Sequence, residues 1–184
     1  MLNRIIREID QSISNECYFA ALALALTIPD ICGKAEYPDK STTARYIQWY
    51  NKYVGKHEKP ESLDVQDMPY MSGEIVFNLR NSLLHQGNPN IEPKKVKEES
   101  CKVDKFKLSI STPFDGGYSM VAYGLGHEIT ERVLEINIIN LCHKLCATAK
   151  GYYNENNEKF DFFDYEINDK RLPDEDTYLF GGNK

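Results

Sequence analysis

Arg80, Asn81 and His85 are the side chains whose types and spacing best suit chemistry on a phosphate. On an α-helix residues 81 and 85 share a face, whereas residues 80 and 85 diverge by about 140°, which a long arginine side chain can span. The guanidinium offers paired donors to phosphate oxygens, and histidine titrates near neutral pH, so it can move a proton. Together they could promote attack of a ribose 2′-hydroxyl on its own phosphodiester, leaving a 2′,3′-cyclic phosphate.

One amphipathic helix must hold these three residues. Ser72 is a good N-cap, Glu74 places a carboxylate in the first turn, and Gly87 ends the helix. The apolar residues of the predicted buried face are Ile75, Val76, Leu79, Leu83 and Leu84. Arg80 and His85 would then lie between this apolar face and the solvent.

A purely structural interpretation of the same residues stays open. In that interpretation Arg80 pairs with an acidic residue, and His85 caps the last carbonyls before Gly87, where a cation suits the helix dipole. Arginine and histidine occur at this spacing by chance in many helices, so the spacing alone is a weak signal.

The rest of the chain predicts a mainly α-helical fold with one inserted β-hairpin. Apolar residues recur at three- and four-residue steps in several segments, whereas Val103–Ile110 alternates apolar and polar residues and is followed by the turn residues 113–117. The expected further helices are 2–13, 17–26, 44–54 and 130–153, and the expected hairpin is 103–123. We expect a bundle of four to five helices over residues 1–153, followed by an acidic, aromatic tail over 154–184.

Composition narrows the class of protein. The net charge is −6 and the acidic excess lies after residue 110, so any nucleic-acid role must rest on a local basic site. The most apolar stretch, 17–31, is interrupted by Pro29 and Asp30 and falls short of a membrane span. Five cysteines, an odd number, are better explained as reduced thiols than as disulfides, which predicts a cytoplasmic protein.

The segment Leu79–Gly87 resembles the signature of the HEPN family, which consists of arginine, a polar residue, three further residues and histidine. The surrounding segments 20–33 and 45–50 are also similar to small bacterial proteins of this group, so the resemblance covers about residues 1–150. It implies a helical bundle that forms a homodimer, with the two signature helices facing a shared cleft. Many relatives are metal-independent ribonucleases of toxin, phage-defence and RNA-processing systems, and the resemblance gives Arg80, Asn81 and His85 the catalytic roles. Other relatives only bind or scaffold.

Several basic and aromatic residues are further candidates for RNA contact. Arg45 and the cluster of Lys94, Lys95 and Lys97 could bind a phosphate backbone, although a lone charge run is usually solvated surface. The aromatic residues of segment 46–53 could stack on bases, but such a stripe is more often core or interface.

Acidic residues and cysteines supply weaker hypotheses. Asp30, Glu36 and Asp39 could approach Arg80 and orient its guanidinium, although turn and loop roles are more common for such residues. Cys142, His143 and Cys146 have zinc-ligand chemistry, but their helical spacing and apolar surroundings favour packing in the core. The segment Phe160–Tyr165 is expected to dock as an ordered tail, with cover of the cleft as the alternative.

The sequence therefore predicts a homodimeric, metal-independent HEPN endoribonuclease that needs no cofactor and acts on RNA. The competing hypotheses are a non-catalytic module that binds RNA, a nucleotide or a protein partner, and a dimeric scaffold without a ligand. An antitoxin or other protein partner is compatible with the first hypothesis, and no membrane contact is expected.

Overall fold

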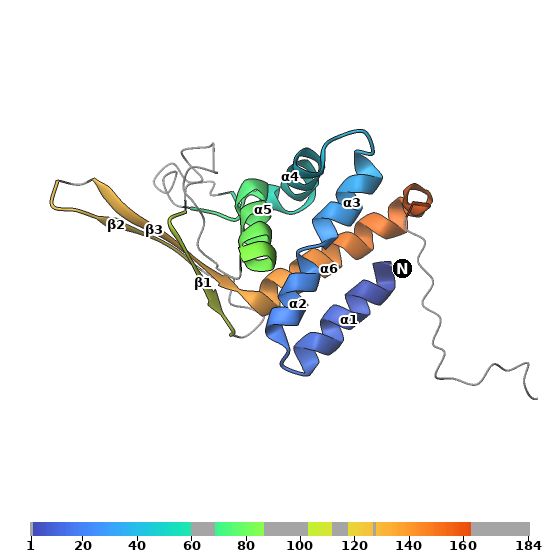
Figure 1. Cartoon of the computed structure of the whole chain (residues 1–184), viewed down its shortest axis with the longest axis horizontal. Coiled ribbons are helices and arrows are strands. Elements are labelled where there is room, and N and C mark those ends of the chain that lie inside the picture. Colours follow the sequence, from blue (N-terminus) through green and yellow to red (C-terminus); the bar gives the residue numbers. More distant parts are fainter. Residues whose placement is uncertain (1, 60–68, 87–102, 112–117, 127, 163–184) are drawn as a thin grey trace, which may run out of the picture.

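The computed structural model describes residues 2–59, 69–86, 103–111, 118–126 and 128–162, with the backbone alone at 85, 86 and 118. Its helices are α1 (Leu2–Ser14), α2 (Tyr18–Ala25), α3 (Ile28–Glu36), α4 (Thr42–Tyr53), α5 (Gly73–Asn81) and α6 (Ile138–Glu155), with the short turns η1 (Gly55–His57), η3 (Ser82–Gln86) and η6 (Asn157–Phe160). Its strands are β1 (Lys105–Ser109), β2 (Tyr118–Tyr123) and β3 (Ile129–Asn137). The prediction of a mainly helical fold is confirmed (Figure 1).

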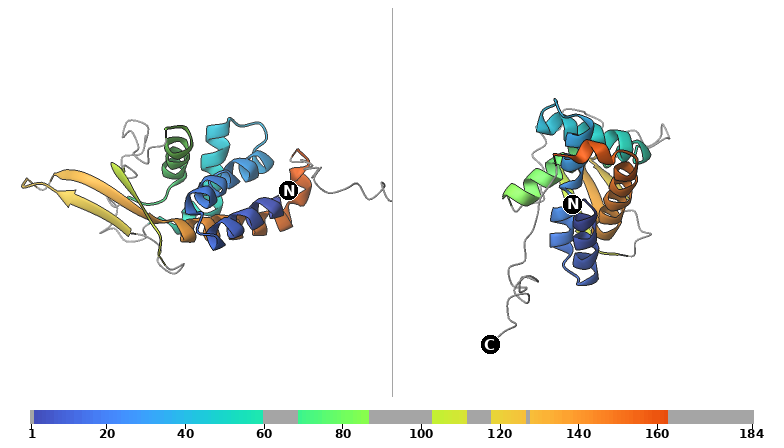
Figure 2. Two further views of the ribbon diagram at one scale, coloured as in Figure 1. Left: turned by 60° about the horizontal axis from the view of Figure 1, so that its bottom comes forward. Right: turned by 90° about the vertical axis from the view of Figure 1, so that its right-hand side faces the viewer.

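Helix α6 is the central helix of the bundle, and it packs against α1, α2 and α3 (Figures 1 and 2). Its buried residues include Leu141, Leu145 and Ala149, which recur at four-residue steps along one face. Helix α2 has a less central place than its apolar sequence suggests, because Phe19 is 58% exposed. An apolar surface is therefore left uncovered on α2.

Helix α4 carries the aromatic core. The side chains of Tyr46, Trp49 and Tyr50 are completely buried, and the Tyr46 hydroxyl donates a hydrogen bond to the Leu26 carbonyl (3.0 Å). Ser41 caps the helix by accepting a hydrogen bond from the amide of Ala44, as its sequence predicts. The aromatic stripe is core, so these three side chains cannot stack on RNA bases.

The predicted hairpin between strands 103–110 and 118–123 is wrong, although both strands exist. The sheet order is β1-β3-β2, with β1 parallel to β3 and β2 antiparallel to β3. The hairpin is instead formed by β2 and β3, and much of it extends beyond the helices (Figure 1). The middle strand, β3, falls almost entirely within the predicted helix 130–153, and without it the sequence makes β1 and β2 the expected neighbours.

The predicted helix 130–153 is correspondingly wrong in its first third, because residues 129–137 form β3. Residues 129–132 are mainly exposed, whereas Val133, Leu134 and Ile136 are all buried where the strand reaches the helices. Burial on both faces removes the two-residue alternation that would have marked a strand. Asn137 ends the strand and caps α6, because its side-chain oxygen accepts a hydrogen bond from the Asn140 amide (3.2 Å).

The segment Tyr18–Glu36 is long and apolar enough, by length and composition alone, to cross a membrane, and half of it is buried inside the fold. The segment is interrupted as expected, but between α2 and α3 instead of at Pro29 and Asp30, because Pro29 lies in the first turn of α3, where a missing amide donor is tolerated. Its burial fits the core helix of a soluble protein.

The first residues of the predicted tail continue the helical domain. Helix α6 ends at Glu155, and Phe160 is buried with its ring centroid 5.9 Å from that of Tyr152 and 4.9 Å from that of Tyr153. The remaining tail residues, 163–184, lie outside the described part of the chain.

Candidate functional site

Contacts at the start of helix α5 fix the position of this helix and therefore of Arg80. The Ser72 side chain accepts a hydrogen bond from the Ile75 amide (3.3 Å), and the Gly73 amide donates to the side-chain oxygen of Asn51 (2.7 Å). A methyl group at Gly73 would lie 2.6 Å from the Ile47 carbonyl oxygen, so α5 can start this close to α4 only with glycine. Leu79 is buried, and Arg80 follows it at the edge of the core.

The Arg80 guanidinium is largely enclosed, with 19% of its side chain exposed. Its Nη1 donates to the Asn81 Oδ1 (3.1 Å), and its Nη2 lies 3.5 Å from the Asp30 Oδ2. The guanidinium carbon lies 6.0 Å from the centroid of the Tyr46 ring, within range of a cation–π interaction. The buried Nε has no hydrogen-bond partner among the described residues, so one donor of this side chain is unused.

Asp30 joins Arg80 to a second guanidinium. The Asp30 Oδ1 accepts hydrogen bonds from the Nη2 (3.0 Å) and the Nε (3.3 Å) of Arg45, while its Oδ2 faces Arg80. The prediction that Asp30 could orient the Arg80 guanidinium is confirmed, and so is the structural interpretation in which Arg80 has an acidic partner.

These residues line a cavity of about 330 Å³, which also includes Thr27, Ile31, Lys34 and Phe162. Lys34, Arg45 and Arg80 bring three positive charges to this cavity, and Asp30 brings one negative charge. A local excess of two positive charges therefore exists in a protein whose net charge is −6. Such a cavity favours an anion with several acceptor oxygens.

The helix that carries Arg80 changes its winding directly after Asn81. Residues Ser82–Gln86 form a π-helical turn, in which hydrogen bonds join residues five apart, and such turns occur frequently at functional sites. A wider turn brings positions five apart toward one face, so it reduces the divergence of about 140° that a regular α-helix gives positions 80 and 85. The backbone of this segment thus favours convergence of the signature positions.

Four of the remaining predicted site side chains lie outside the described structure, and Glu36 takes part in a different cluster. The side chain of His85, and all of Lys94, Lys95 and Lys97, lie outside the described part of the structure, so their roles stay predictions. Glu36 does not approach Arg80, because it accepts hydrogen bonds from Lys52, Tyr53, Tyr152 and Lys159, and Asp39 is exposed.

Cys32, Cys142 and Cys146 pack in the core, as their apolar surroundings predict, whereas Cys17 is exposed. Cys142 and Cys146 are buried, and burial raises the pKa of each thiol to about 12, so the thiolate that a metal needs is disfavoured. Among the described residues, no group of three or more histidine, cysteine or acidic side chains could hold a metal ion.

Sequence reasoning missed three residues that line the cavity, namely Thr27, Ile31 and Lys34. Lys34 follows Asp30 by four residues on α3, and this spacing, which places both on one face, could have revealed it. Phe162 is 45% exposed at the cavity wall, and this position agrees with the alternative hypothesis in which the segment Phe160–Tyr165 covers the cleft.

Comparison of the chain with protein-family models, with curated proteins and with solved structures finds no match in any of the three. The chemistry of the Arg80 cavity therefore carries the functional argument.

Proposed function

We propose that this protein is a metal-independent endoribonuclease of HEPN type that acts in the cytoplasm as a homodimer. The observation that carries the proposal is the position of Arg80, which is largely enclosed beside Arg45 and Lys34. It has one donor without a partner among the described residues, and it lies in a cavity with a local excess of two positive charges. RNA cleavage is the activity that a role as a toxin or in phage defence would use.

In the proposed reaction the scissile phosphate occupies the cavity beside Arg80 and Arg45. Asp30 holds both guanidiniums in place, and Asn81 holds the Arg80 Nη1, so the donors are ordered before the substrate arrives. The 2′-oxygen attacks phosphorus as its proton passes to a base, and the bond from phosphorus to the 5′-oxygen breaks as that oxygen gains a proton. We assign these proton transfers to His85, and the second copy of the chain supplies a second His85.

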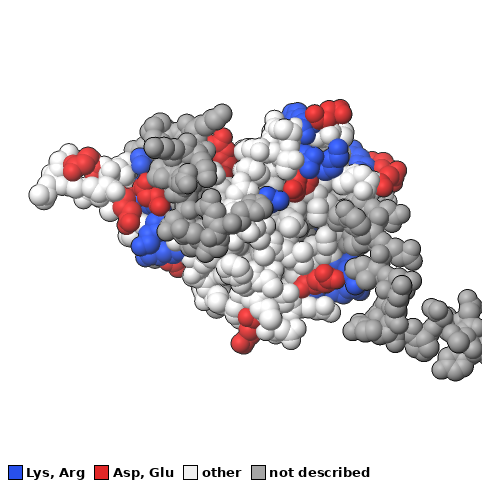
Figure 3. Space-filling model, viewed as in Figure 1, with Lys and Arg blue, Asp and Glu red and all other residues white. Residues whose placement is uncertain are grey.

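A second copy would cover the apolar surface next to this site. Phe19 on α2 is 58% exposed and Leu84 in η3 is 39% exposed, and the molecular face over α2 is mostly uncharged (Figure 3). Burying large apolar side chains favours association. Sedimentation of the wild type beside Phe19→Glu and the exposed control Gln11→Glu tests this part: a dimer that only Phe19→Glu dissociates supports it, and a monomeric wild type contradicts it.

The cleavage experiment uses labelled single-stranded RNA and tRNA in EDTA, with end-group analysis of the products. We expect wild-type protein to leave 2′,3′-cyclic phosphates, and Arg80→Ala and His85→Ala each to lower the rate by about 10²- to 10⁴-fold. Arg4→Ala is the matched control, because Arg4 forms an exposed ion pair with Glu8 and its loss should leave cleavage unchanged. Equal traces of cleavage in all proteins would indicate contamination and contradict the proposal.

One observation favours the non-catalytic alternative. Arg80 is already engaged by Asp30 and Asn81, and only about a fifth of its side chain is exposed, which suits a rigid binding site better than a catalyst that must follow changes of charge on the phosphate. This alternative predicts that RNA binds without being cut and that Arg80→Ala abolishes the binding.

A further inference from the structure

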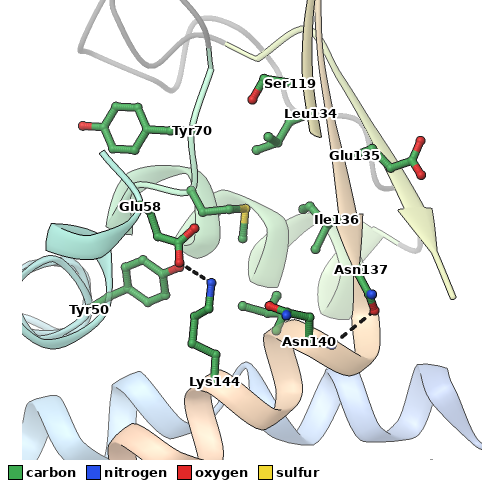
Figure 4. Close-up of a pocket in the computed structure, with 12 residues that line it drawn as sticks. Tyr50, Glu58, Tyr70, Ser119, Leu134, Glu135, Ile136, Asn137, Asn140 and Lys144 are labelled. Carbon is green, nitrogen blue, oxygen red and sulfur yellow. Dashed lines mark hydrogen bonds and ion pairs between the residues drawn. The ribbon is translucent and has the colours of Figure 1, made fainter. Parts of the chain in front are cut away.

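A second cavity, of about 110 Å³, lies beyond the start of α5, whereas Arg80 lies near its end (Figure 4). Its walls come from the end of α4, the segment before α5, strand β3 and the first turns of α6. One water molecule needs only about 10–15 Å³ of such volume, and sites for drug-sized ligands have about 300–1,000 Å³. The space fits a small ring system and is too small for a drug-sized ligand.

The Tyr50 hydroxyl is the unexplained group in this cavity. Its side chain is completely buried, and the hydroxyl has no hydrogen-bond partner among the described residues. Burial, with a further contribution from the negative charge of Glu58, raises the pKa of Tyr50 well above its usual range, so the phenol stays neutral and can donate. A buried hydroxyl without a partner destabilises a fold, and a ligand acceptor would remove that penalty.

Glu58 and Lys144 form an ion pair next to Tyr50, and Figure 4 shows these three side chains converging on one side of the cavity. Their charges cancel, and the carboxylate of Glu135 points away from them (Figure 4). This cavity therefore lacks the positive excess of the Arg80 cavity. It favours a neutral ligand that both donates and accepts hydrogen bonds, because an anion would gain no net attraction.

The rest of the wall mixes apolar side chains with the polar side chains of Ser119, Asn137 and Asn140. The apolar side chains include Met71, Leu134 and Ile136. A ligand with an apolar ring body and one polar edge matches this mixture, and burying that ring is favourable.

We propose that this cavity binds a neutral lactam ring of the nucleobase type, as found in uracil and hypoxanthine. The ring carbonyl accepts hydrogen bonds from the Tyr50 hydroxyl and the Lys144 ammonium, and the adjacent ring N–H donates to the Glu58 carboxylate. The inference does not depend on RNA cleavage, because free nucleosides occupy the site and Arg80 takes no part.

The test is calorimetric titration of the full chain with uridine and inosine, beside 3-methyluridine, which keeps the carbonyls but lacks the ring N–H. A hydrogen bond to a charged group contributes about 1.5–3 kcal/mol, so we expect 3-methyluridine to bind about 10- to 100-fold more weakly than uridine. Tyr50→Phe removes only the hydroxyl and should weaken uridine binding about two- to tenfold, without unfolding the protein.

Tyr53→Phe is the matched control, because Tyr53 lies on the same helix and its hydroxyl contacts Glu36 instead of the cavity. We expect Tyr53→Phe to bind uridine like the wild type, and because the titration uses a free nucleoside, a failure of RNA cleavage leaves this result unaffected. The proposal is overturned if neither uridine nor inosine binds at about 10 mM, if 3-methyluridine binds as well as uridine, or if Tyr50→Phe binds like the wild type.

Discussion

Protonation of Glu36 should remove a large part of the stability of this fold. Its side chain is 11% exposed, and it accepts hydrogen bonds from Lys52 (2.6 Å) and Tyr53 (3.0 Å) on α4, Tyr152 (2.9 Å) on α6, and Lys159 (2.9 Å) in η6. One carboxylate on α3 thus ties three other segments together. Replacing it with Gln keeps the shape of the side chain and removes the charge.

The size and sign of the effect follow from the pKa of Glu36. Burial alone would raise this pKa, but the hydrogen bonds from the two lysines and two tyrosines outweigh burial and lower it from 4.5 to about 2. A depressed carboxyl pKa stabilises the fold above pH 4.5, and the stabilisation is lost as the pH falls toward 2. The full difference corresponds to about 3 kcal/mol, of which about 2 kcal/mol is lost by pH 3. Because Lys52 is half exposed, solvent screening makes about 2 kcal/mol the expected full effect.

The assay is urea unfolding followed by circular dichroism at pH 7 and at about pH 2.5. Glu36→Gln should lower the free energy of unfolding by about 2 kcal/mol at pH 7, and by less than about 1 kcal/mol at the lower pH. Glu8→Gln is the control, because Glu8 is 46% exposed in its pair with Arg4 and should change stability little at either pH. An equal loss for Glu36→Gln at both pH values, or a Glu36 carboxyl that titrates above pH 4 by NMR, would refute the reasoning.

Three further predictions concern the elements around the Arg80 cavity. Gly33→Ala places a methyl carbon 2.7 Å from the Arg45 carbonyl oxygen where α3 meets α4, so the melting temperature should fall, with a loss of about 1–3 kcal/mol. Ser72→Ala removes the buried cap that accepts from the Ile75 amide and should lower the free energy of urea unfolding by about 1 kcal/mol. Asp30→Asn leaves the neighbouring cations without a counter-charge, so it should destabilise by about 1–2 kcal/mol in dilute buffer and by less in about 0.5 M salt, where repulsion is screened.

The local sequence predicted those features that a single segment determines. The helices α1, α4 and α5, the cap at Ser72, and the burial of Cys142 and Cys146 each follow from spacing or capping chemistry within a few residues. The strand β3 could not be recognised in this way, because Val133, Leu134 and Ile136 are buried by elements distant in sequence and lose the alternation of a half-exposed strand.

The sequence by itself determined which residue types could act on a phosphate and that Arg80 stands at the end of a helix. Only the tertiary structure decided that Asp30 and Arg45 meet it, because residues 15 and 50 positions apart in the chain converge through the packing of α3, α4 and α5. It also decided that the Tyr50 hydroxyl lies at a cavity with no hydrogen-bond partner among the described residues, since burial depends on every element around a residue. Charge and spacing are local properties, whereas enclosure and the cancellation of charges arise only when distant segments meet.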